Sequence, residues 1–326
     1  MFQFTKRNYL HAFYGLLTLL APLVAGTILN NNWLGVMGCF GALLFMYYVP
    51  VNRDNTLNQL LVVNLCAWIS FPLSALASRV EWVSMLWIAG LAFFLQLIMS
   101  ANRFIGPGVF FLLMINGMLA SLHSMPLNTV CLLAVYAIFG AIFATLLALI
   151  ENGQYEHYSL SWPKIKVTNT DLPANLRALI IGLFAFLAYF IGYHLHLNNY
   201  YWLLVSALTI LQSENVMTAK KRQLEYIGAG LIGTVLAFVI YSWVDAIFLL
   251  ALLALLFMAL ICLFMPKSYL IGNFFTTPIA LILFKIVRPG LGNDLIVTRI
   301  LAILLGTMIG LIGVWYYDWL ISKLEN

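Results

Sequence analysis

The chain has 326 residues, of which 63% are hydrophobic and 8% are charged, and its formal net charge is +5. Soluble domains are about half apolar and about a quarter charged, so this composition excludes a water-soluble protein and indicates one that crosses the lipid bilayer many times. The positive charges are spread over many short segments, which is typical of basic membrane loops and argues against nucleic acid as a partner.

The first apolar run follows Lys6 and Arg7 and has the length of a membrane span, roughly 20 residues. No small-residue cleavage site follows it, so we expect a retained helix and not a signal peptide. Later runs lack the alternation of barrel strands. We therefore predict an all-α membrane protein with about 12 transmembrane helices. The predicted helices cover residues 10–29, 33–50, 57–77, 83–101, 105–122, 128–150, 175–194, 200–213, 224–242, 246–265, 268–287 and 297–320.

The longest hydrophilic stretch, residues 151–173, separates two apolar halves, residues 1–150 and 174–326. It is expected to be a cytoplasmic linker, since it is too short for a domain. Each half contains six of the predicted helices, an even number, so both halves start from the same side of the membrane. We therefore expect two parallel six-helix repeats, an arrangement in which transporters bind substrate near the midplane between the halves.

Matching residues in the two halves support a duplication. Trp33 precedes Arg53 by the same spacing that separates Trp202 from Arg222. Several matches in order predict an internal repeat. When the second half is aligned with the first, Arg177 also matches Arg7, Pro278 matches Gly108 and Gly306 matches Gly140.

The distribution of cations predicts the orientation. With the N-terminus in the cytoplasm, twelve of the sixteen Lys and Arg residues fall on the cytoplasmic side and four on the outer side, as the positive-inside rule requires. An even number of helices then places both termini in the cytoplasm, and we expect a multi-pass protein of the bacterial inner membrane. The four outer cations are Arg79, Lys285, Arg288 and Arg299.

Five cations are candidates for a substrate pathway. Arg53 and Arg222 occupy equivalent cytoplasmic positions in the two halves, where they either anchor the topology or flank an entrance that suits anions. Lys285, Arg288 and Arg299 lie on the outer side against the general bias and are expected in an exit path. Asp294 is the expected partner of Arg299.

Carboxylates and amides complete the candidate site. Glu214 and Glu225 lie near helix ends and are either solvated or the groups that couple transport to protons. Gln212 ends the apolar run that begins at Trp202 and is expected in the substrate pathway. Asn116 lies deep in a span, where it either bonds a neighbouring helix or lines a polar cavity.

Catalytic motifs are absent from the sequence: it has no HExxH, GxSxG, Walker A or dinucleotide-binding pattern. We therefore expect neither an enzyme nor an ATP-driven pump, and no cofactor. His194 and His196 form a pair without a nearby third ligand, so no metal site is expected.

Two motifs carry a resemblance to a known family. One is the Trp-led run from Tyr201 to Ser213 with its following basic segment, and the other is the helix from Arg299 to Gly310, which contains Gly306-Thr307. With the layout of two six-helix halves, these resemble the fusaric acid resistance family, also called the aromatic acid exporter family, over most of the chain. The resemblance implies export of aromatic or other hydrophobic carboxylates and work with a periplasmic adaptor protein.

The chain also departs from that family. It lacks the large cytoplasmic domain that many members carry, and Glu225 to Ala229 replaces the frequent Arg-x-x-Gly-Thr. We expect an inner-membrane secondary transporter that exports small organic anions coupled to protons, and its helix faces permit a homo-oligomer. The alternatives are a transporter of the major-facilitator type, whose Gly-x-x-x-Asp-Arg loop is missing, a non-transporting membrane subunit, and an enzyme of lipid-linked substrates.

Overall fold

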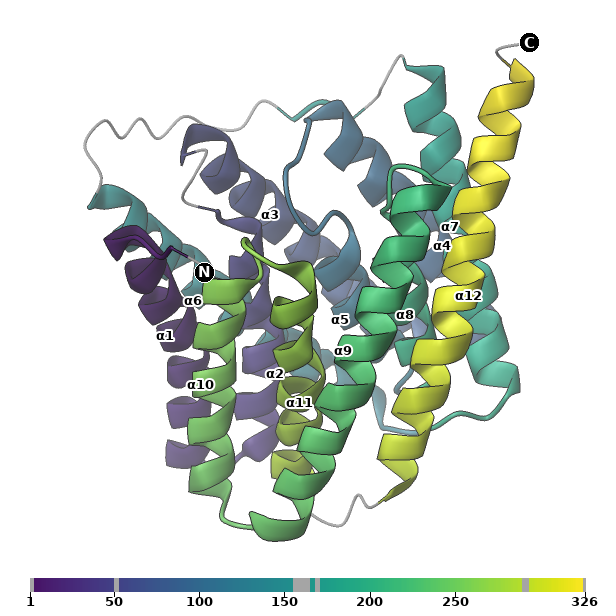
Figure 1. The fold of residues 1–326 in the computed structure, drawn as a ribbon. Coiled ribbons are helices and arrows are strands. Elements are labelled where there is room, and N and C mark those ends of the chain that lie inside the picture. The colour runs from purple at the N-terminus through teal and green to yellow at the C-terminus, as the bar shows by residue number, and fades with distance from the viewer. Residues whose placement is uncertain (1–2, 50–52, 155–164, 168–170, 289–292, 325–326) are drawn as a thin grey trace. The chain divides into compact units, whose positions relative to one another are not determined.

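The computed structural model describes residues 3–49, 53–154, 165–167, 171–288 and 293–324, with side chains for all of these except residues 53–55 and 293. The described part is helical and contains no strand, which confirms the predicted all-α class (Figure 1). A helix coincides with each apolar run of the sequence. The elements are α1 (Lys6–Ile28), α2 (Asn32–Ala42), the 3-10 helix η1 (Leu43–Tyr47), α3 (Arg53–Ala77), α4 (Glu81–Ala101), α5 (Phe110–Ala120), α6 (Leu127–Gly153), α7 (Leu172–His194), α8 (Tyr201–Leu211), α9 (Val216–Trp243), α10 (Ile247–Phe264), α11 (Tyr269–Val287) and α12 (Asn293–Leu324).

The helices differ in whether they are long enough to span a membrane. Among the described residues, nine are long and apolar enough, and α2 with η1, α5 and α8 are shorter. At 1.5 Å per residue, the 11 residues of α8 extend about 16 Å, roughly half of the hydrocarbon core. Every residue of α8 is buried. The short helices are thus apolar because they pack inside the protein, and twelve full-length spans are more than the structure supports.

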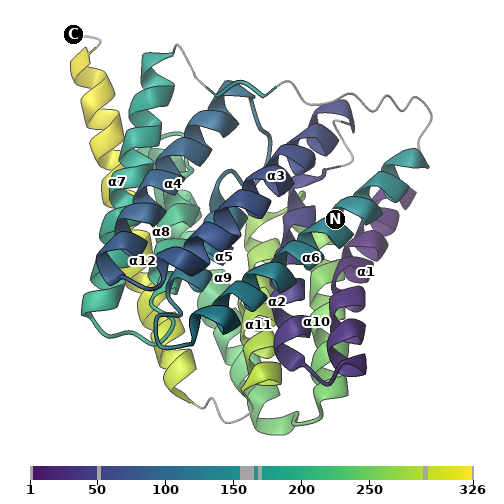
Figure 2. The ribbon, with the colours of Figure 1, turned by 180° about the vertical axis from the view of Figure 1, so that it is seen from behind.

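The chain forms two compact units, and each takes helices from both halves of the sequence. Unit 1 comprises residues 1–68, 132–163 and 228–296, and unit 2 comprises residues 69–131, 164–227 and 297–326. In unit 1, α1 packs against α2 and α10, and α11 packs against α10 and α2. In unit 2, α7 packs against α4 and α8, and α5 packs against α4 and α8 (Figures 1 and 2). The predicted division at residues 151–173 concerns sequence repeats and stays a prediction.

In each unit, glycines bring the backbones of neighbouring helices close together, as one pair in each unit illustrates. In unit 1, a Cβ on Gly41 of α2 would collide with the carbonyl of Ala137 in α6. In unit 2, a Cβ on Gly306 of α12 would lie 2.6 Å from the carbonyl oxygen of Leu203 in α8. Small residues permit such close approach in membranes. In the predicted repeat, α2 and α6 correspond to α8 and α12, and the repeat itself stays a prediction.

Candidate functional site

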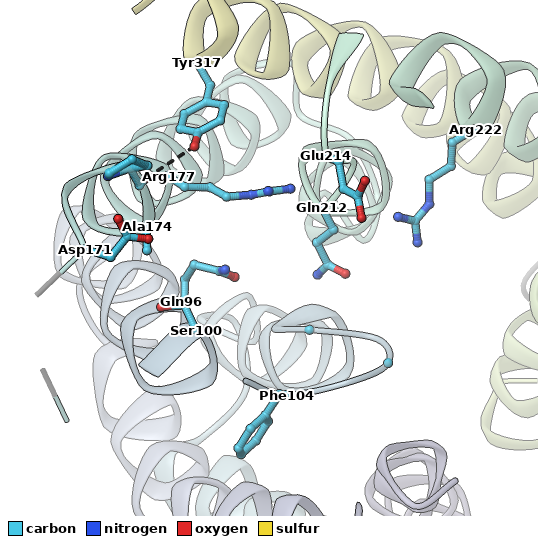
Figure 3. Close-up of a pocket in the computed structure, with 13 residues that line it drawn as sticks. Gln96, Ser100, Phe104, Asp171, Ala174, Arg177, Gln212, Glu214, Arg222 and Tyr317 are labelled. Atoms are coloured by element: carbon cyan, nitrogen blue, oxygen red, sulfur yellow. Dashed lines mark hydrogen bonds between the residues drawn. The ribbon is translucent and has the colours of Figure 1, made fainter. Parts of the chain in front are cut away.

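A cavity of about 560 Å³ lies within unit 2 (Figure 3). Its walls come from the end of α4 and the loop after it, the start of α7, the end of α8, the start of α9 and the end of α12. On the predicted orientation, all of these segments lie on the cytoplasmic side. The lining residues are Gln96, Ser100, Phe104, Gly106, Gly108, Asp171, Pro173, Ala174, Arg177, Gln212, Glu214, Arg222 and Tyr317.

A tight turn between α8 and α9 brings three of the predicted site residues to this cavity. Gln212 follows the last residue of α8, and the Asn215 side chain then begins α9 by accepting from the backbone N–H of Thr218 at 2.9 Å. Such N-terminal caps satisfy a free helix donor. Glu214 lies in the turn and Arg222 lies two turns into α9, so all three line one cavity. The structure thus brings together Gln212, Glu214 and Arg222.

Gln212 carries a buried donor that points into the cavity (Figure 3). Among the described residues, its Nε2 has no hydrogen-bond partner. The loop after α4 lies against the amide, since a Cβ on Gly108 would come within 2.9 Å of its carbon and oxygen atoms. Gly108 has a φ of +53°, and Gly106 has a φ of +117°, which L side chains rarely adopt. Buried polar groups without a partner are costly, so an acceptor in the cavity would be favoured.

Arg177 was not among the predicted site residues, and it links three walls of the cavity. Its Nη2 donates to the carbonyl oxygen of Ser213 at 2.5 Å, and its guanidinium lies 5.7 Å from the centre of the Tyr317 ring. The Tyr317 hydroxyl donates in turn to the carbonyl of Pro173 at 3.4 Å. The signal that could have identified Arg177 is its position inside an apolar run, where a charged residue indicates function.

The charges that line the cavity are balanced. Arg177 and Arg222 provide two cations, and Asp171 and Glu214 provide two exposed carboxylates. Glu225, the other residue predicted for proton coupling, is half-buried in α9 and does not line the cavity. Because the lining has no net charge, it has no overall positive potential that attracts anions. It recognises a ligand by where its individual cations and carboxylates lie.

The three outer cations that were expected in an exit path belong to different compact units. Arg299 lies in unit 2, is 5% exposed, and its Nη2 donates to the Tyr226 hydroxyl at 3.3 Å. Its guanidinium lies 5.3 Å from the centre of the Trp202 ring, an arrangement that stabilises a cation. Asp294, its expected partner, is exposed at the start of α12. Arg299 therefore joins α12 to the start of α8 and to the part of α9 about three turns from its start, outside the cavity lining.

Lys285 and Arg288 lie in unit 1. Lys285 is 4% exposed. Its ammonium group donates to the carbonyl oxygens of Tyr241 and Val244, both at 2.7 Å, and to Oδ1 of Asp245 at 3.0 Å. A cation is favoured at the end of a helix such as α9, where carbonyl groups lack partners. The guanidinium of Arg288 lies 5.8 Å from the centre of the Trp33 ring.

The remaining predicted residues are Asn116 and Arg53. Asn116 is fully buried, accepts from the Ser74 hydroxyl at 2.6 Å, and donates to the Ser70 hydroxyl at 3.0 Å. These bonds join α5 to α3, which is the helix-packing alternative of the two that its position allowed. The structure does not describe the side chain of Arg53.

Comparison with known proteins gives a match to a family model over one segment of the chain. Residues 187–313 match the family model described as fusaric acid resistance protein-like. The resemblance to this family is therefore confirmed for the segment from α7 to α12, which includes Gln212, Glu214 and Arg222. No curated protein and no solved structure matches the chain. Together, the family match and the apolar helices support a multi-pass membrane transporter.

Proposed function

We propose that the chain is a secondary transporter of the bacterial inner membrane that exports small organic anions such as aromatic carboxylates, with the cavity of unit 2 as the anion-binding site. The observation that carries this proposal is the buried Nε2 of Gln212, which lacks an acceptor among the described residues and lies on the same cavity as Arg222. A carboxylate would accept from both groups, and such charge-assisted bonds are stronger than neutral ones.

The size and the lining of the cavity suit an anion with an apolar body. Its volume of about 560 Å³ falls within the range of small-molecule sites, roughly 300 to 1,000 Å³. The Tyr317 ring adds aromatic surface to the lining (Figure 3). Arg177 bonds the carbonyl oxygen of Ser213 and holds the walls in place. Arg222 also lines the cavity, and a planar guanidinium has the geometry that grips a carboxylate with two donors.

The charge of the substrate also supplies a driving force. A membrane potential with a negative interior drives anions outward by about 2.3 kcal/mol per charge and 100 mV. Glu214, which lines the cavity, and Glu225, which lies on α9 outside it, are the two carboxylates of this region that stay candidates for proton coupling.

The test measures initial rates of aryl carboxylate transport by the purified protein in proteoliposomes. We expect Arg222→Gln and Gln212→Leu each to lower kcat/KM by roughly 10- to 100-fold, the effect of losing a hydrogen bond to a charged group. Lys221→Gln is the matched control, since Lys221 is an exposed cation next to Arg222 that does not line the cavity. It is expected to leave the rate unchanged.

Other outcomes would point elsewhere. Transport that survives both cavity substitutions would reject this site and keep the transporter class. A protein that moves no anion, alone or with the periplasmic adaptor that the family resemblance implies, would favour a non-transporting subunit. Light scattering of the detergent-solubilised protein would determine whether the transporter is a homo-oligomer.

A further inference from the structure

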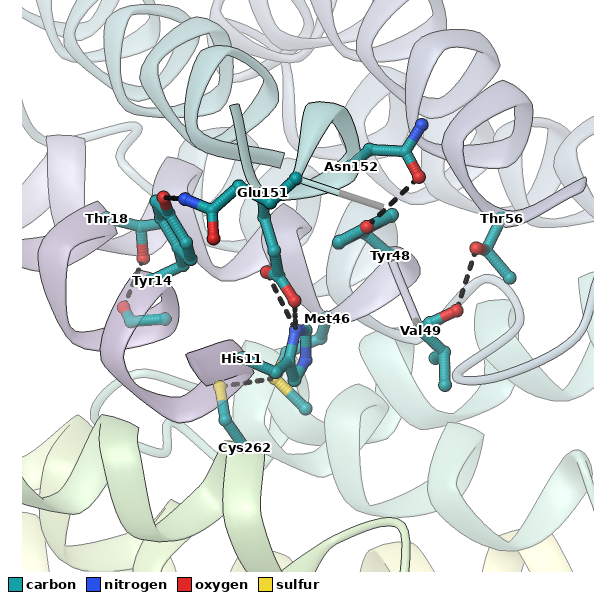
Figure 4. A network of polar contacts seen from close by, with 12 residues as sticks. His11, Tyr14, Thr18, Met46, Tyr48, Val49, Thr56, Glu151, Asn152 and Cys262 are labelled. Atoms are coloured by element: carbon teal, nitrogen blue, oxygen red, sulfur yellow. Dashed lines mark hydrogen bonds and ion pairs between the residues drawn. The ribbon is translucent and has the colours of Figure 1, made fainter. Parts of the chain in front are cut away.

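Unit 1 buries a histidine and a glutamate against each other (Figure 4). The Nδ1 atom of His11 lies 3.1 Å from Oε2 and 3.3 Å from Oε1 of Glu151. His11 is 4% exposed and Glu151 is fully buried. His11 lies in the second turn of α1 and Glu151 in the last turn of α6, so the pair occupies one end of both helices. On the predicted orientation, that end is cytoplasmic.

The surroundings of the pair are apolar or uncharged. The imidazole stacks on the Phe45 ring of η1, with the ring centres 4.9 Å apart. On α10, the Cys262 thiol lies 3.9 Å from the Met46 sulfur. The other titratable groups that face the pair are phenols: Tyr48 donates to the Asn152 side chain at 3.3 Å, and Tyr14 bonds the Gln154 side chain.

Formal charges on the packed elements are few. The sequences of α2, η1 and α10 contain no charged residue, and α6 contains none besides Glu151. On α1, Lys6 and Arg7 are exposed. Residues 53–68 of α3 also belong to unit 1, and the side chains of Arg53 and Asp54 at its start lie outside the described ones. The described side chains around the pair therefore place no further formal charge inside this part of unit 1.

A pair of this kind is poorly explained as a stabilising contact alone. Desolvation of two ions offsets most of their attraction, so apolar side chains of similar size are often as stable. Imidazole is also the side chain that ordinarily changes its charge between about pH 5 and 8. Ionisable groups buried in membrane proteins mark proton pathways.

We propose that His11 and Glu151 form the proton-binding site that couples anion export to the proton gradient, an inference that rests on the proposed function. With a neutral imidazole and an ionised carboxylate, the pair has a net charge of −1. A hydronium ion transfers one proton to an imidazole nitrogen: an O–H bond breaks, an N–H bond forms and a water molecule is left, which brings the net charge of the pair to zero. The neutral pair is favoured when buried, and the pair of net charge −1 favours a conformation that admits water.

The location of the pair suits exchange of a proton for an anion. An exporter driven by inward proton movement must hold the proton and the anion in turn. Glu214 lines the anion cavity, so a proton on it would share the site of the anion and would not alternate with it. His11 and Glu151 belong to unit 1, whereas the cavity belongs to unit 2. Helices α3 and α9 each contribute residues to both units, so they provide a continuous backbone for coupling.

Two transport assays separate coupling from binding. The probe is an aryl carboxylate in proteoliposomes, followed first by exchange of labelled for unlabelled anion without a gradient and then by transport driven by a pH gradient at zero membrane potential. We expect His11→Gln and Glu151→Gln to lower gradient-driven transport at least tenfold and to leave exchange within about twofold. Tyr48→Phe is the control, because it removes a neighbouring hydroxyl and keeps the pair, and it should retain both activities.

A direct measurement does not depend on transport. The detergent-solubilised protein is titrated between about pH 8 and pH 5, and bound protons are counted against a pH dye. The wild-type chain should bind about one proton more than the H11Q/E151Q variant. Equal proton binding would overturn the proposal even if the protein moves anions. A wild-type chain that binds the extra proton but moves no anion would refute the proposed function instead.

A structural role would give a different pattern. Parallel loss of exchange, gradient-driven transport and thermal stability in both single variants would overturn the proposal. If those variants are not recovered folded, the exchanged pair H11E/E151H, which keeps one imidazole and one carboxylate, replaces them. It should then restore the extra bound proton, and its failure to do so would count against the pair.

Discussion

Lys285 uses its three N–H donors at the end of α9, where it bonds two backbone carbonyls and the Asp245 carboxylate. Its expected role in an exit path competes with this capping role. The structure favours capping, because an ammonium with its donors occupied has none left for a passing anion. Asp245 is largely exposed, so the ion pair itself contributes little and the two carbonyl bonds matter more.

We expect Lys285→Met to lower the stability of the detergent-solubilised protein by roughly 1–3 kcal/mol, the effect of leaving buried acceptors without a donor. The transport rate per folded molecule should stay near that of the wild type. Thermal unfolding and proteoliposome transport, measured on the same preparation, check both statements. Normal stability with lost transport would return Lys285 to the substrate pathway.

At the scale of single residues, sequence separation explains what could be predicted. Gln212 and Glu214 come together because one turn of chain holds them, so their spacing was informative. Arg177 reaches the same cavity from a different helix, and Glu151 reaches His11 across 140 residues. Only tertiary contacts create such pairs, and no local pattern of residues reports them.

Individual helices were the most predictable elements, because a long apolar run that satisfies its own backbone bonds in lipid must be a helix. The lengths of α2, α5 and α8 were not predictable in the same way. Burial inside the protein and exposure to lipid both select apolar side chains, so hydropathy cannot distinguish α8, which is wholly buried, from a lipid-facing span. Close backbone contacts give a second, testable property of these short helices.

We expect Gly41→Ala to destabilise the protein by roughly 1–3 kcal/mol, because the added methyl group meets the backbone of Ala137 and the two helices must separate. Gly90→Ala in α4 is the matched control, since its added Cβ meets nothing within 4 Å. Alanine should there be neutral or stabilising by up to about 1 kcal/mol. Thermal unfolding of both variants in detergent checks this, and equal midpoints would contradict the contact between α2 and α6.

On the scale of the whole molecule, the compact units do not follow the order of the chain. Unit 1 combines α1, α2 and α6 with α10 and α11, and unit 2 combines α7, α8 and α12 with α4 and α5. A repeat in sequence is readable from matching residues, but which copy completes which unit depends on long-range packing. The way in which each unit combines helices from both halves, which we call interleaving, could therefore not be predicted from the sequence.

Interleaving makes each half dependent on the other. We expect residues 1–154 and 171–326, expressed as separate chains, to be degraded when made alone, because each lacks the helices that cover its apolar faces. Co-expression should restore a stable complex that migrates with the intact protein in size-exclusion chromatography. Accumulation of either half alone in a protease-resistant form would contradict this dependence.

The same dependence has a consequence for descent. If the halves are copies of one six-helix ancestor, that ancestor could complete a unit by exchanging two helices with a second molecule, and would have existed as an intertwined pair. On that premise, fusion of the two genes would have fixed the ratio of the two copies and allowed their sequences to diverge. One unit could then keep a buried histidine and glutamate while the other kept a ligand cavity, a difference that two identical subunits cannot have.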